Sequence, residues 1–242
     1  NVAKQTGALL KAYLTERGLT IDKNSPITIS YGISCVDVNT LNANVGGGDK
    51  IKRLIQMNEG GVRTVPWFQG SNVPRGFKFP AYARAIAGHG GTDIMPVMQA
   101  QEVPWRVAAG FSWFSSYIPF STEFRAWIFR GEILDIYEKV MERPHEYVHV
   151  GGRNFRQGFE FKKVTDSLNV PDDVTLQARK VLKAVKFDFA AIDMLYGEDG
   201  KVYVLEANSA PGCIRSHCES TLAKLADRMT TWVQNGCPTR TY

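Results

Sequence analysis

The sequence predicts a mixed α/β (α+β) fold. Three observations lead to this class. Helical and strand-like periodicities alternate over the first 70 residues, runs rich in β-branched and aromatic residues fill the middle of the chain, and two strand-like runs near the C-terminal end are joined by a Gly-Glu-Asp-Gly turn. A Gly-, Ser- and Pro-containing stretch at 70–76 indicates a linker, and we expect three units, at 1–70, 71–120 and 121–242.

The first unit is predicted to be a small α/β domain. Residues 3–17 have the spacing of an amphipathic helix, and 27–31 and 62–68 have the composition of strands. Between them, Asp49 is placed to cap a helix that ends at Gly60-Gly61. The apolar residues expected on the inner face of this helix are Ile51, Leu54 and Ile55.

The second unit and the start of the third are predicted to be rich in strands. Residues 77–99 contain two strand-like runs around a Gly-containing loop. The segment 122–141 follows, with a hairpin turn at Arg130-Gly131-Glu132.

The rest of the third unit is predicted to hold two helices and a hairpin. Pro171-Asp172-Asp173 starts a helix, the runs 187–196 and 201–209 form the hairpin, and an amphipathic helix closed by Gly236 ends the unit.

The composition is that of a globular protein with a mildly basic surface. Apolar residues make up 44% and charged residues 22%, and a net charge of +5 suits a polyanion, either nucleic acid or the phosphates of a nucleotide. No apolar run is long enough to cross a bilayer and no signal peptide is recognisable, so we expect a cytoplasmic protein with no membrane contact. The cysteines lack zinc-finger spacing and are expected to be free thiols; they are Cys35, Cys213, Cys218 and Cys237.

The stretch VYVLEANSAPG (202–212) places polar side chains at the end of an apolar strand. Glu206 and Asn208 share one strand face, which by simple alternation is also the face of Val202 and Val204. The partner strand of the hairpin carries Asp193, so two carboxylates and a carboxamide are expected to converge. Oxygen ligands of this kind favour Mg²⁺ or Mn²⁺. The alternative is that each carboxylate faces water or forms a salt bridge.

These motifs resemble the ATP-grasp ligases, and most closely the amino-acid ligase branch that includes the ribosomal-protein glutamate ligases. Asp193 followed by LEANSAPG (205–212) is similar to the metal-binding end of that superfamily. In the same order, TEFRAWIFRGEI, GGRNFRQGFEF and FPAYARAIAGHGGTDI are similar to further segments of the branch, over about residues 49–215. The resemblance implies a small N-terminal α/β unit followed by two subdomains that grip ATP.

The resemblance also implies roles for single residues in binding ATP and Mg²⁺ (or Mn²⁺). Asp193, Glu206 and Asn208 would hold the metal. Arg84 would replace the usual Lys that binds phosphate, and the glycines Gly90 and Gly91 of His89-Gly90-Gly91-Thr92 would form a flap over the phosphates. Tyr117 and Ile118 lie where the hinge of the family binds adenine, although Tyr117 would equally suit a core or surface position.

The catalytic residues implied by the resemblance are basic. Arg125, which shares a strand face with Glu123 two residues earlier, would bind a substrate carboxylate or the transferred phosphate; alternatively it forms a cross-strand ion pair. Lys139 and Arg156 are further candidates for contacting the phosphoryl group, and Glu123 and Lys139 are included among the nucleotide-binding residues. The Arg that other branches place two residues before the first metal-binding Asp is Ala191 here.

The function that the resemblance implies is ATP-dependent ligation of a carboxylate and an amine, which are expected to be small molecules or peptides. The alternative hypothesis is a non-catalytic module that keeps the fold and binds protein or nucleic acid, with tryptophans as stacking residues. Those tryptophans are Trp67, Trp105, Trp113 and Trp127. Nucleic acid is the less favoured partner, because no Lys/Arg-rich run is present. The sequence indicates neither the acid, nor the amine, nor the oligomeric state.

Overall fold

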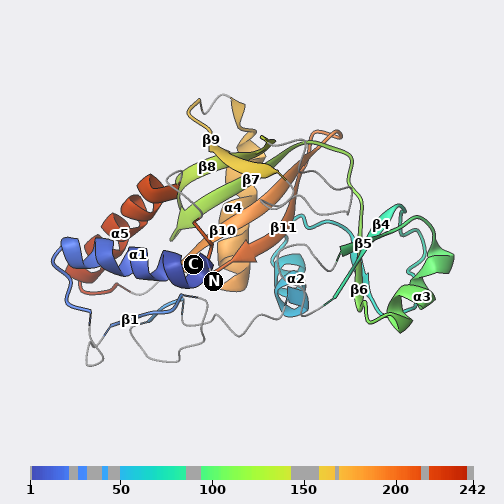
Figure 1. Ribbon diagram of the computed structural model, residues 1–242, viewed down its shortest axis with the longest axis horizontal. Coiled ribbons are helices and arrows are strands. Elements are labelled where there is room, and N and C mark those ends of the chain that lie inside the picture. The colour runs from blue at the N-terminus through green and yellow to red at the C-terminus, as the bar shows by residue number, and fades with distance from the viewer. Residues whose placement is uncertain are drawn as a thin grey trace.

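Two antiparallel sheets joined side by side form the body of the protein (Figure 1). The computed structural model describes residues 2–21, 27–31, 40–42, 50–85, 94–142, 158–166, 169–213 and 218–238. In this part of the chain no helix combines the length and the apolarity needed to span a membrane.

The larger sheet has five strands in the order β11-β10-β7-β8-β9. Their bounds are Phe120–Phe129 (β7), Glu132–Met141 (β8), Phe159–Lys163 (β9), Phe189–Gly197 (β10) and Val202–Asn208 (β11). Both predicted hairpins are present, as β7–β8 and β10–β11. The β7–β8 turn holds Arg130 and Gly131 at φ of 46° and 91°, the left-handed geometry of a tight two-residue hairpin turn. Strand β7 of the first hairpin pairs with β10 of the second, which joins the two hairpins in one sheet.

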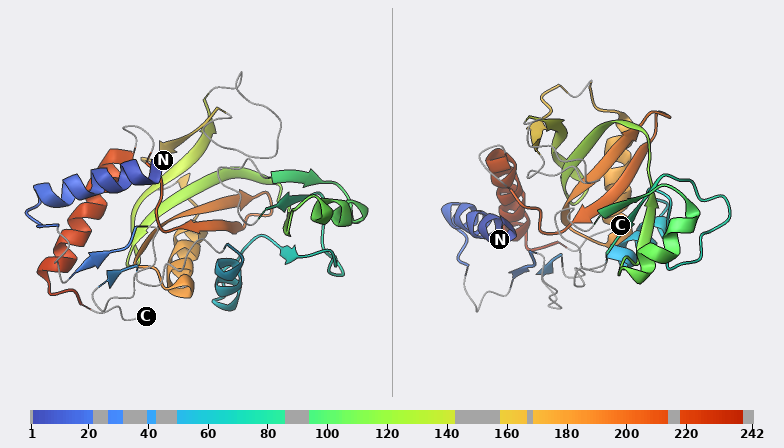
Figure 2. Two further views of the ribbon diagram at one scale, coloured as in Figure 1. Left: turned by 60° about the horizontal axis from the view of Figure 1, so that its bottom comes forward. Right: turned by 45° about the vertical axis from the view of Figure 1, so that its right-hand side comes forward.

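Helices cover both faces of this sheet (Figures 1 and 2). α4 (Asp172–Val185) packs on one face together with α2 (Lys50–Glu59). α1 (Val2–Glu16) and α5 (Glu219–Gln234) pack on the other face and against each other. The two faces therefore have separate apolar cores, and the strands between them are apolar on both sides along most of their length.

The smaller sheet extends the molecule at the end away from α1 and α5 (Figure 1). Its strands are β3 (Trp67–Gln69), β4 (Ala81–Arg84), β5 (Ile94–Val97) and β6 (Trp113–Ser116), in the order β3-β6-β4-β5. The 3-10 turn η1 (Ala100–Glu102) and the short helix α3 (Val103–Ala108) connect β5 to β6. One face of this sheet has a small core of its own, built around Phe68, Ala83, Val97, Val103 and Phe114.

The described residues from α1 to α2 pack against the larger sheet. β1 (Thr28–Ile29) and β2 (Thr40–Leu41) form a two-stranded parallel sheet. It is followed by the fully buried Asn42, whose Oδ1 accepts from the N–H groups of Asp188 and Phe189 at 2.6 and 3.1 Å and whose Nδ2 donates to the Phe189 carbonyl at 3.0 Å. Asn42 therefore fixes this small sheet to the start of β10. The boundaries at residues 70 and 120 stay a prediction.

A buried charge network joins α5 to the larger sheet. The Asp135 carboxylate on β8 accepts from Lys163 at 2.7 Å, from Lys224 at 2.8 Å and from the Thr221 hydroxyl at 2.7 Å. Burial raises the pKa of Asp135, but these three donors hold it below its ordinary value. The carboxylate is therefore kept charged inside the α5–sheet contact.

Two local expectations are corrected. In α2, Met57 is buried and Ile55 is 43% exposed, so the inner face of the helix is made by Ile51, Leu54 and Met57. The strand expected at 62–68 is shorter, because only Trp67–Gln69 joins a sheet and the preceding residues make a single bridge from Thr64 to Val204. Pro66 has no N–H to donate to a ladder, which explains why regular pairing starts after it.

Candidate active site

Charged side chains gather on the larger sheet where its helical cover ends. On the face that holds α1 and α5, the apolar residues of β7 and β10 are succeeded along the strands by Glu123 and Arg125 on β7 and by Asp193 on β10. Arg125, Asp193 and Glu206 are direct cross-strand neighbours on β7, β10 and β11. Three strands thus place one basic and two acidic side chains next to one another, and opposite charges that face each other across strands attract.

A β-bulge brings Glu206 and Asn208 to this face. The pairing of β10 with β11 shifts between Asp193 and Met194, so that Met194 faces Val204 while Asp193 faces Glu206. Val202 and Val204 therefore pack in the core beneath α4, together with Ala207, whereas Glu206 and Asn208 point to the opposite side. Our expectation that these polar residues share a face with Val202 and Val204 was wrong, because simple alternation does not allow for the extra residue of a bulge.

Asp193 is the centre of the site and is held by a bidentate ion pair. Arg125 donates from Nε to Oδ1 at 2.6 Å and from Nη2 to Oδ2 at 2.8 Å, and the two side chains are only 17% and 8% exposed. Asn208 donates from Nδ2 to Glu206 Oε1 at 2.9 Å and to Asp193 Oδ2 at 3.4 Å. The two carboxylates and the carboxamide are thus brought together as the sequence predicted.

The charges of this cluster are mutually stabilising. Burial by itself raises the pKa of Asp193, but the positive charge of Arg125, with a further contribution from Lys139, holds that pKa below its ordinary value. Burial by itself lowers the pKa of Arg125, and Asp193 more than offsets this effect, so the pKa of Arg125 is raised. Both groups are therefore charged at neutral pH in spite of their burial.

A second ion pair lies beside the first. Lys139 on β8 donates its ammonium to Glu123 on β7, and these side chains are 11% and 6% exposed. Arg125 thus forms a cross-strand ion pair with Asp193, as the alternative interpretation of this residue expected. Both basic side chains lie over the ring of Phe161 on β9, with Arg125 Cζ 4.1 Å and Lys139 Nζ 5.1 Å from its centroid.

The smaller sheet contributes Arg84. Its guanidinium lies over the Trp113 ring, 5.1 Å from the centroid, and donates from Nε to Ser115 Oγ at 3.1 Å. Burial lowers the pKa of Arg84, while the negative charges of Glu206 and Glu123 act in the opposite direction. These carboxylates belong to the larger sheet, so Arg84 on the smaller sheet interacts electrostatically with acidic side chains of the larger sheet.

The chain crosses between the two sheets at Tyr117 and Ile118. β6 ends at Ser116 and β7 starts at Phe120, so these residues occupy the connection, as expected of a hinge. The Tyr117 N–H donates to the Pro80 carbonyl at 2.9 Å, and its ring is 39% exposed and edge-on to Tyr82. The Tyr117 amide is thus already engaged in the connection itself.

Residues of the first unit hold the segment that follows β11. The Tyr31 hydroxyl donates to the Pro211 carbonyl, and the Cys213 N–H donates to Thr6 Oγ1 at 2.8 Å. Burial raises the pKa of Tyr31, so this hydroxyl stays protonated. The thiols of Cys213 and Cys218 lie near it.

Several predicted residues lie outside the described part of the chain. They are Gly90 and Gly91 with the rest of the flap, Arg156, Cys35, and the helix cap Asp49.

The donor set at Asp193 fits a hard divalent cation. It offers two carboxylates and a carboxamide, all oxygen ligands of the kind that Mg²⁺ binds. Over the residues that the structure describes, no group of three or more His, Cys, Asp or Glu side chains converges. A cation here would be held by Asp193, Glu206 and Asn208, with water and phosphate completing its shell, and a cation without a polyanion would bind weakly.

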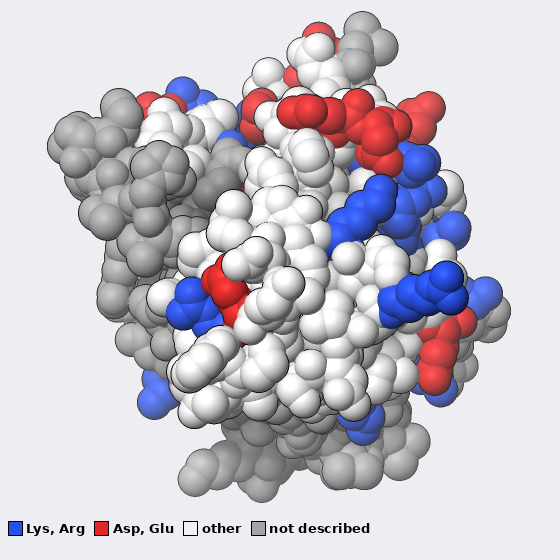
Figure 3. Space-filling model, turned by 90° about the vertical axis from the view of Figure 1, so that its right-hand side faces the viewer, with Lys and Arg blue, Asp and Glu red and all other residues white. Residues whose placement is uncertain are grey.

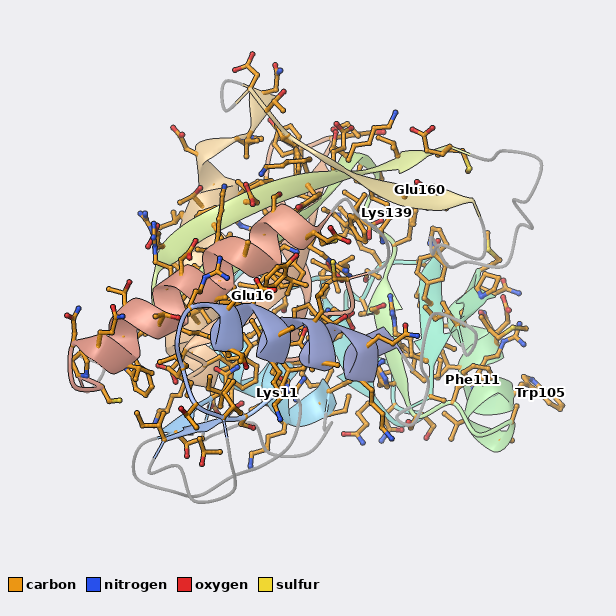
Figure 4. The ribbon with its side chains drawn as sticks, turned by 60° about the vertical axis from the view of Figure 1, so that its left-hand side comes forward. Lys11, Glu16, Trp105, Phe111, Lys139 and Glu160 are labelled. Atoms are coloured by element: carbon orange, nitrogen blue, oxygen red, sulfur yellow. The ribbon has the colours of Figure 1, made fainter. Side chains whose placement is uncertain are left out.

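The tryptophans proposed as stacking residues are mostly core residues. Trp113 and Trp127 are buried, and Trp67 packs against the core beneath α4. Trp105 is 78% exposed and projects from α3 at the end of the molecule (Figure 4). The face at this end is largely uncharged, with Lys and Arg gathered along one side of it (Figure 3). The four tryptophans therefore do not form a shared stacking surface.

Solved structures show which fold this arrangement belongs to. The ATP-grasp ligase PsnB, complexed with a phosphomimetic variant of minimal precursor, Mg and ADP, matches with a TM-score of 0.56 and 14% identity over 79% of this chain and 62% of that chain. The D-alanine–D-alanine ligase from Bacillus anthracis matches with a TM-score of 0.60 and 18% identity over 78% of this chain and 68% of that chain. The chain has the ATP-grasp fold.

One further solved structure matches the chain to a similar degree. The N5-carboxyaminoimidazole synthetase from Staphylococcus aureus, complexed with ADP, matches with a TM-score of 0.58 and 13% identity over 78% of this chain and 54% of that chain. This chain thus spans less than two thirds of PsnB and of the synthetase. No protein-family model and no curated protein matches the sequence. The likeness to the glutamate-ligase branch stays a prediction.

Within the ATP-grasp fold, the sequence did not point to Phe161 or Ser115. Phe161 lies under two of the predicted basic residues, and Ser115 binds a third. Both stand in short strands where alternation predicts which face a residue takes but not what lies across it. Only the register of β9 with β8, and of β6 with β4, brings them to the site.

Proposed function

We propose that the protein is an ATP-dependent carboxylate–amine ligase that forms an amide bond through an acyl phosphate. The observation that carries this proposal is the row Arg125–Asp193–Glu206–Asn208, flanked by Lys139 and facing Arg84 on the other sheet. Buried acids and bases in such a row suit the binding of a metal together with a polyphosphate. The ATP-grasp fold supports this interpretation, as do the ADP and Mg in the PsnB complex.

In the proposed first step, a substrate carboxylate oxygen attacks the γ-phosphorus of ATP, and the β–γ bond breaks to release ADP. Bound Mg²⁺ would neutralise negative charge on the phosphates. Arg84 would hold the polyphosphate from the smaller sheet. Arg125, whose Nη1 is not used by Asp193, and Lys139 would stabilise the charge on the transferred group. Asp193, Glu206 and Asn208 would hold the cation.

In the proposed second step, the amine nitrogen attacks the acyl carbon, phosphate leaves, and the nitrogen gives up a proton. No nucleophilic Ser or Cys of the protein takes part. The segment after β11, which Thr6 and Tyr31 hold, is the proposed wall of the acceptor site. Arg156, Gly90 and Gly91 keep their proposed roles at the phosphates. The described cysteines are thiols rather than disulfides, which fits a reducing compartment, and we propose the cytoplasm.

The test is to incubate the protein with Mg-ATP and pooled amino acids and peptides, and to analyse nucleotides and condensed products by mass spectrometry. The proposal predicts ADP, phosphate and a product whose mass is the sum of two substrates less water. Glu206→Gln is expected to abolish the product, whereas Glu198→Gln, at an exposed acid in the turn of the same hairpin, is the matched control and should leave it unchanged. AMP in place of ADP, or turnover unaffected by Glu206→Gln, would contradict the proposal.

The same experiment addresses the non-catalytic alternative. A protein that binds oligonucleotide or protein without consuming ATP would give no condensed product, and its binding would not depend on Glu206. The burial of Trp113 and Trp127 disfavours a stacking surface, so we keep the ligase as the proposed function.

A further inference from the structure

We propose that Phe161 is a positioning residue that holds Arg125 and Lys139 in place for the phosphoryl group. This inference rests on the proposed function and extends it to a side chain that carries no charge and that no motif in the sequence singles out. Its ring lies against both basic side chains.

The geometry comes from the register of three strands. Phe161 on β9 is the direct cross-strand partner of Lys139 on β8, and Tyr137, two residues before Lys139, is the partner of Arg125 on β7. Phe161 and Arg125 therefore lie two strands apart, with β8 between them, and their long side chains meet on one face of the sheet. Figure 4 shows Lys139 next to β9, the strand that also carries Glu160.

Each cation is held between a carboxylate and the ring. Arg125 has Asp193 at its fork and Phe161 at 4.1 Å from Cζ, and Lys139 has Glu123 at its ammonium and Phe161 at 5.1 Å from Nζ. The face of an aromatic ring is the negative part of its quadrupole and attracts cations, more strongly where water is excluded. Arg125 and Lys139 are 17% and 11% exposed, so the attraction acts in a largely dry setting.

The ring is needed because the carboxylate partners are shared. Asp193 is a proposed metal ligand and Glu123 a proposed nucleotide-site residue, so each has less negative charge to offer its basic partner when the site is filled. Two positive side chains this close together also repel each other. A ring that binds both, and that takes no part in binding the substrate, keeps them from turning toward water and directs them to the place where phosphoryl charge develops.

The inference makes a structural prediction that does not depend on activity. Protons above the face of an aromatic ring are shielded, so the Arg125 Hδ and Lys139 Hε resonances of the full chain should lie upfield of those of other Arg and Lys residues in NMR spectra. Phe161→Leu should remove both shifts, and Phe161→Tyr, which retains the ring, should keep them. Phe77→Leu serves as the control, because Phe77 is a half-buried ring that contacts Phe68 and Phe79.

The functional prediction uses the same three variants. Phe161→Leu should weaken the binding of Mg-ATP, measured by calorimetry, about tenfold and should lower kcat by about tenfold to a hundredfold, whereas KM for the acid changes little. Phe161→Tyr should restore both values to within about threefold of wild type, and Phe77→Leu should alter neither.

The outcomes separate this inference from the function on which it rests. If the wild-type protein does not bind Mg-ATP, the proposed function fails, and the inference fails with it. If wild type binds and turns over but Phe161→Leu does so equally well, the ligase proposal stands and the positioning role is overturned. Loss of activity in Phe161→Leu and Phe161→Tyr alike, with no upfield shift in wild type, would show a merely structural residue and would equally overturn it.

Discussion

The ion pair between Arg125 and Asp193 should be strongly coupled in folding, and its burial sets the magnitude. The pair has two hydrogen bonds of 2.6 and 2.8 Å between side chains that are 17% and 8% exposed. Removing one member of a buried pair leaves an unpaired charge and costs about 3–5 kcal/mol. The bond from Asn208 to Asp193 is 3.4 Å long, which is long enough to offset little of this cost.

We therefore expect Arg125→Met to lower the free energy of unfolding by about 3 kcal/mol, measured by urea denaturation. The double variant Arg125→Met/Asp193→Asn should be no less stable than this single variant, so that the coupling energy in a double-mutant cycle is at least about 2 kcal/mol. The coupling is expected because the second change removes the charge that the first leaves unpaired.

The chain offers a matched control for this cycle. Arg228 and Glu132 form a bidentate pair of the same geometry, at 2.7 and 2.6 Å, but are 46% and 49% exposed. The coupling energy there should stay below about 1 kcal/mol, because water screens the pair. Additive effects at Arg125 and Asp193, within about 0.5 kcal/mol, would refute the argument that burial makes this pair strong.

Three further predictions concern the fold that supports the site. The pKa of Asp135 is held below its ordinary value in the folded state, so its contribution to the stability of the fold should be complete above about pH 4 and lost as the pH falls further. Unfolding curves of Asp135→Asn should therefore depend less on acid pH than those of wild type, and an unchanged dependence would contradict this. Asn42→Ala should lower the free energy of unfolding, measured by denaturation, by about 3 kcal/mol, because it removes three buried hydrogen bonds. Asn42→Gly should lower it by up to about 1 kcal/mol less, because φ at this position is 59°; equal losses in the two variants would contradict a contribution from φ. Gly60→Ala should cost about 1–3 kcal/mol because its Cβ would lie 2.5 Å from that of Ala184 on α4, and Ala184→Gly should relieve the clash; a neutral Gly60→Ala would contradict the packing of α2 on α4.

Much of the fold was predictable because its signals are local. The turn chemistry around Gly131 and Gly200 predicts both hairpins without knowledge of the rest of the chain, and the spacing of Val174 to Val185 predicts α4. The error at Ile55 has a local cause as well. In a ten-residue helix the apolar residues Ile51, Leu54, Ile55 and Met57 leave the buried face open to more than one choice, and only packing against α4 settles it.

The site was predictable where two strands adjoin in sequence and unpredictable where they do not. Asp193, Glu206 and Asn208 belong to one hairpin, so their convergence follows from a single turn. Arg125 and Asp193 are 68 residues apart in the sequence, and they pair only because β7 lies beside β10. The same strand pairing makes Asp193, rather than Glu123, the partner of Arg125. The bulge at Asp193 is likewise a property of two strands together, and no spacing within β11 reveals it.

The central claim, that Asp193, Glu206 and Asn208 bind a divalent cation together with a nucleotide, is tested most directly by titrating Mn²⁺ into the protein with and without ATP and counting bound Mn²⁺ by electron paramagnetic resonance. We predict tight binding only with ATP, weakened about tenfold or more by Glu206→Gln, a neutral and nearly isosteric change. Glu198→Gln should bind as wild type does. Equal Mn²⁺ affinity in wild type and Glu206→Gln in the presence of ATP would contradict the account.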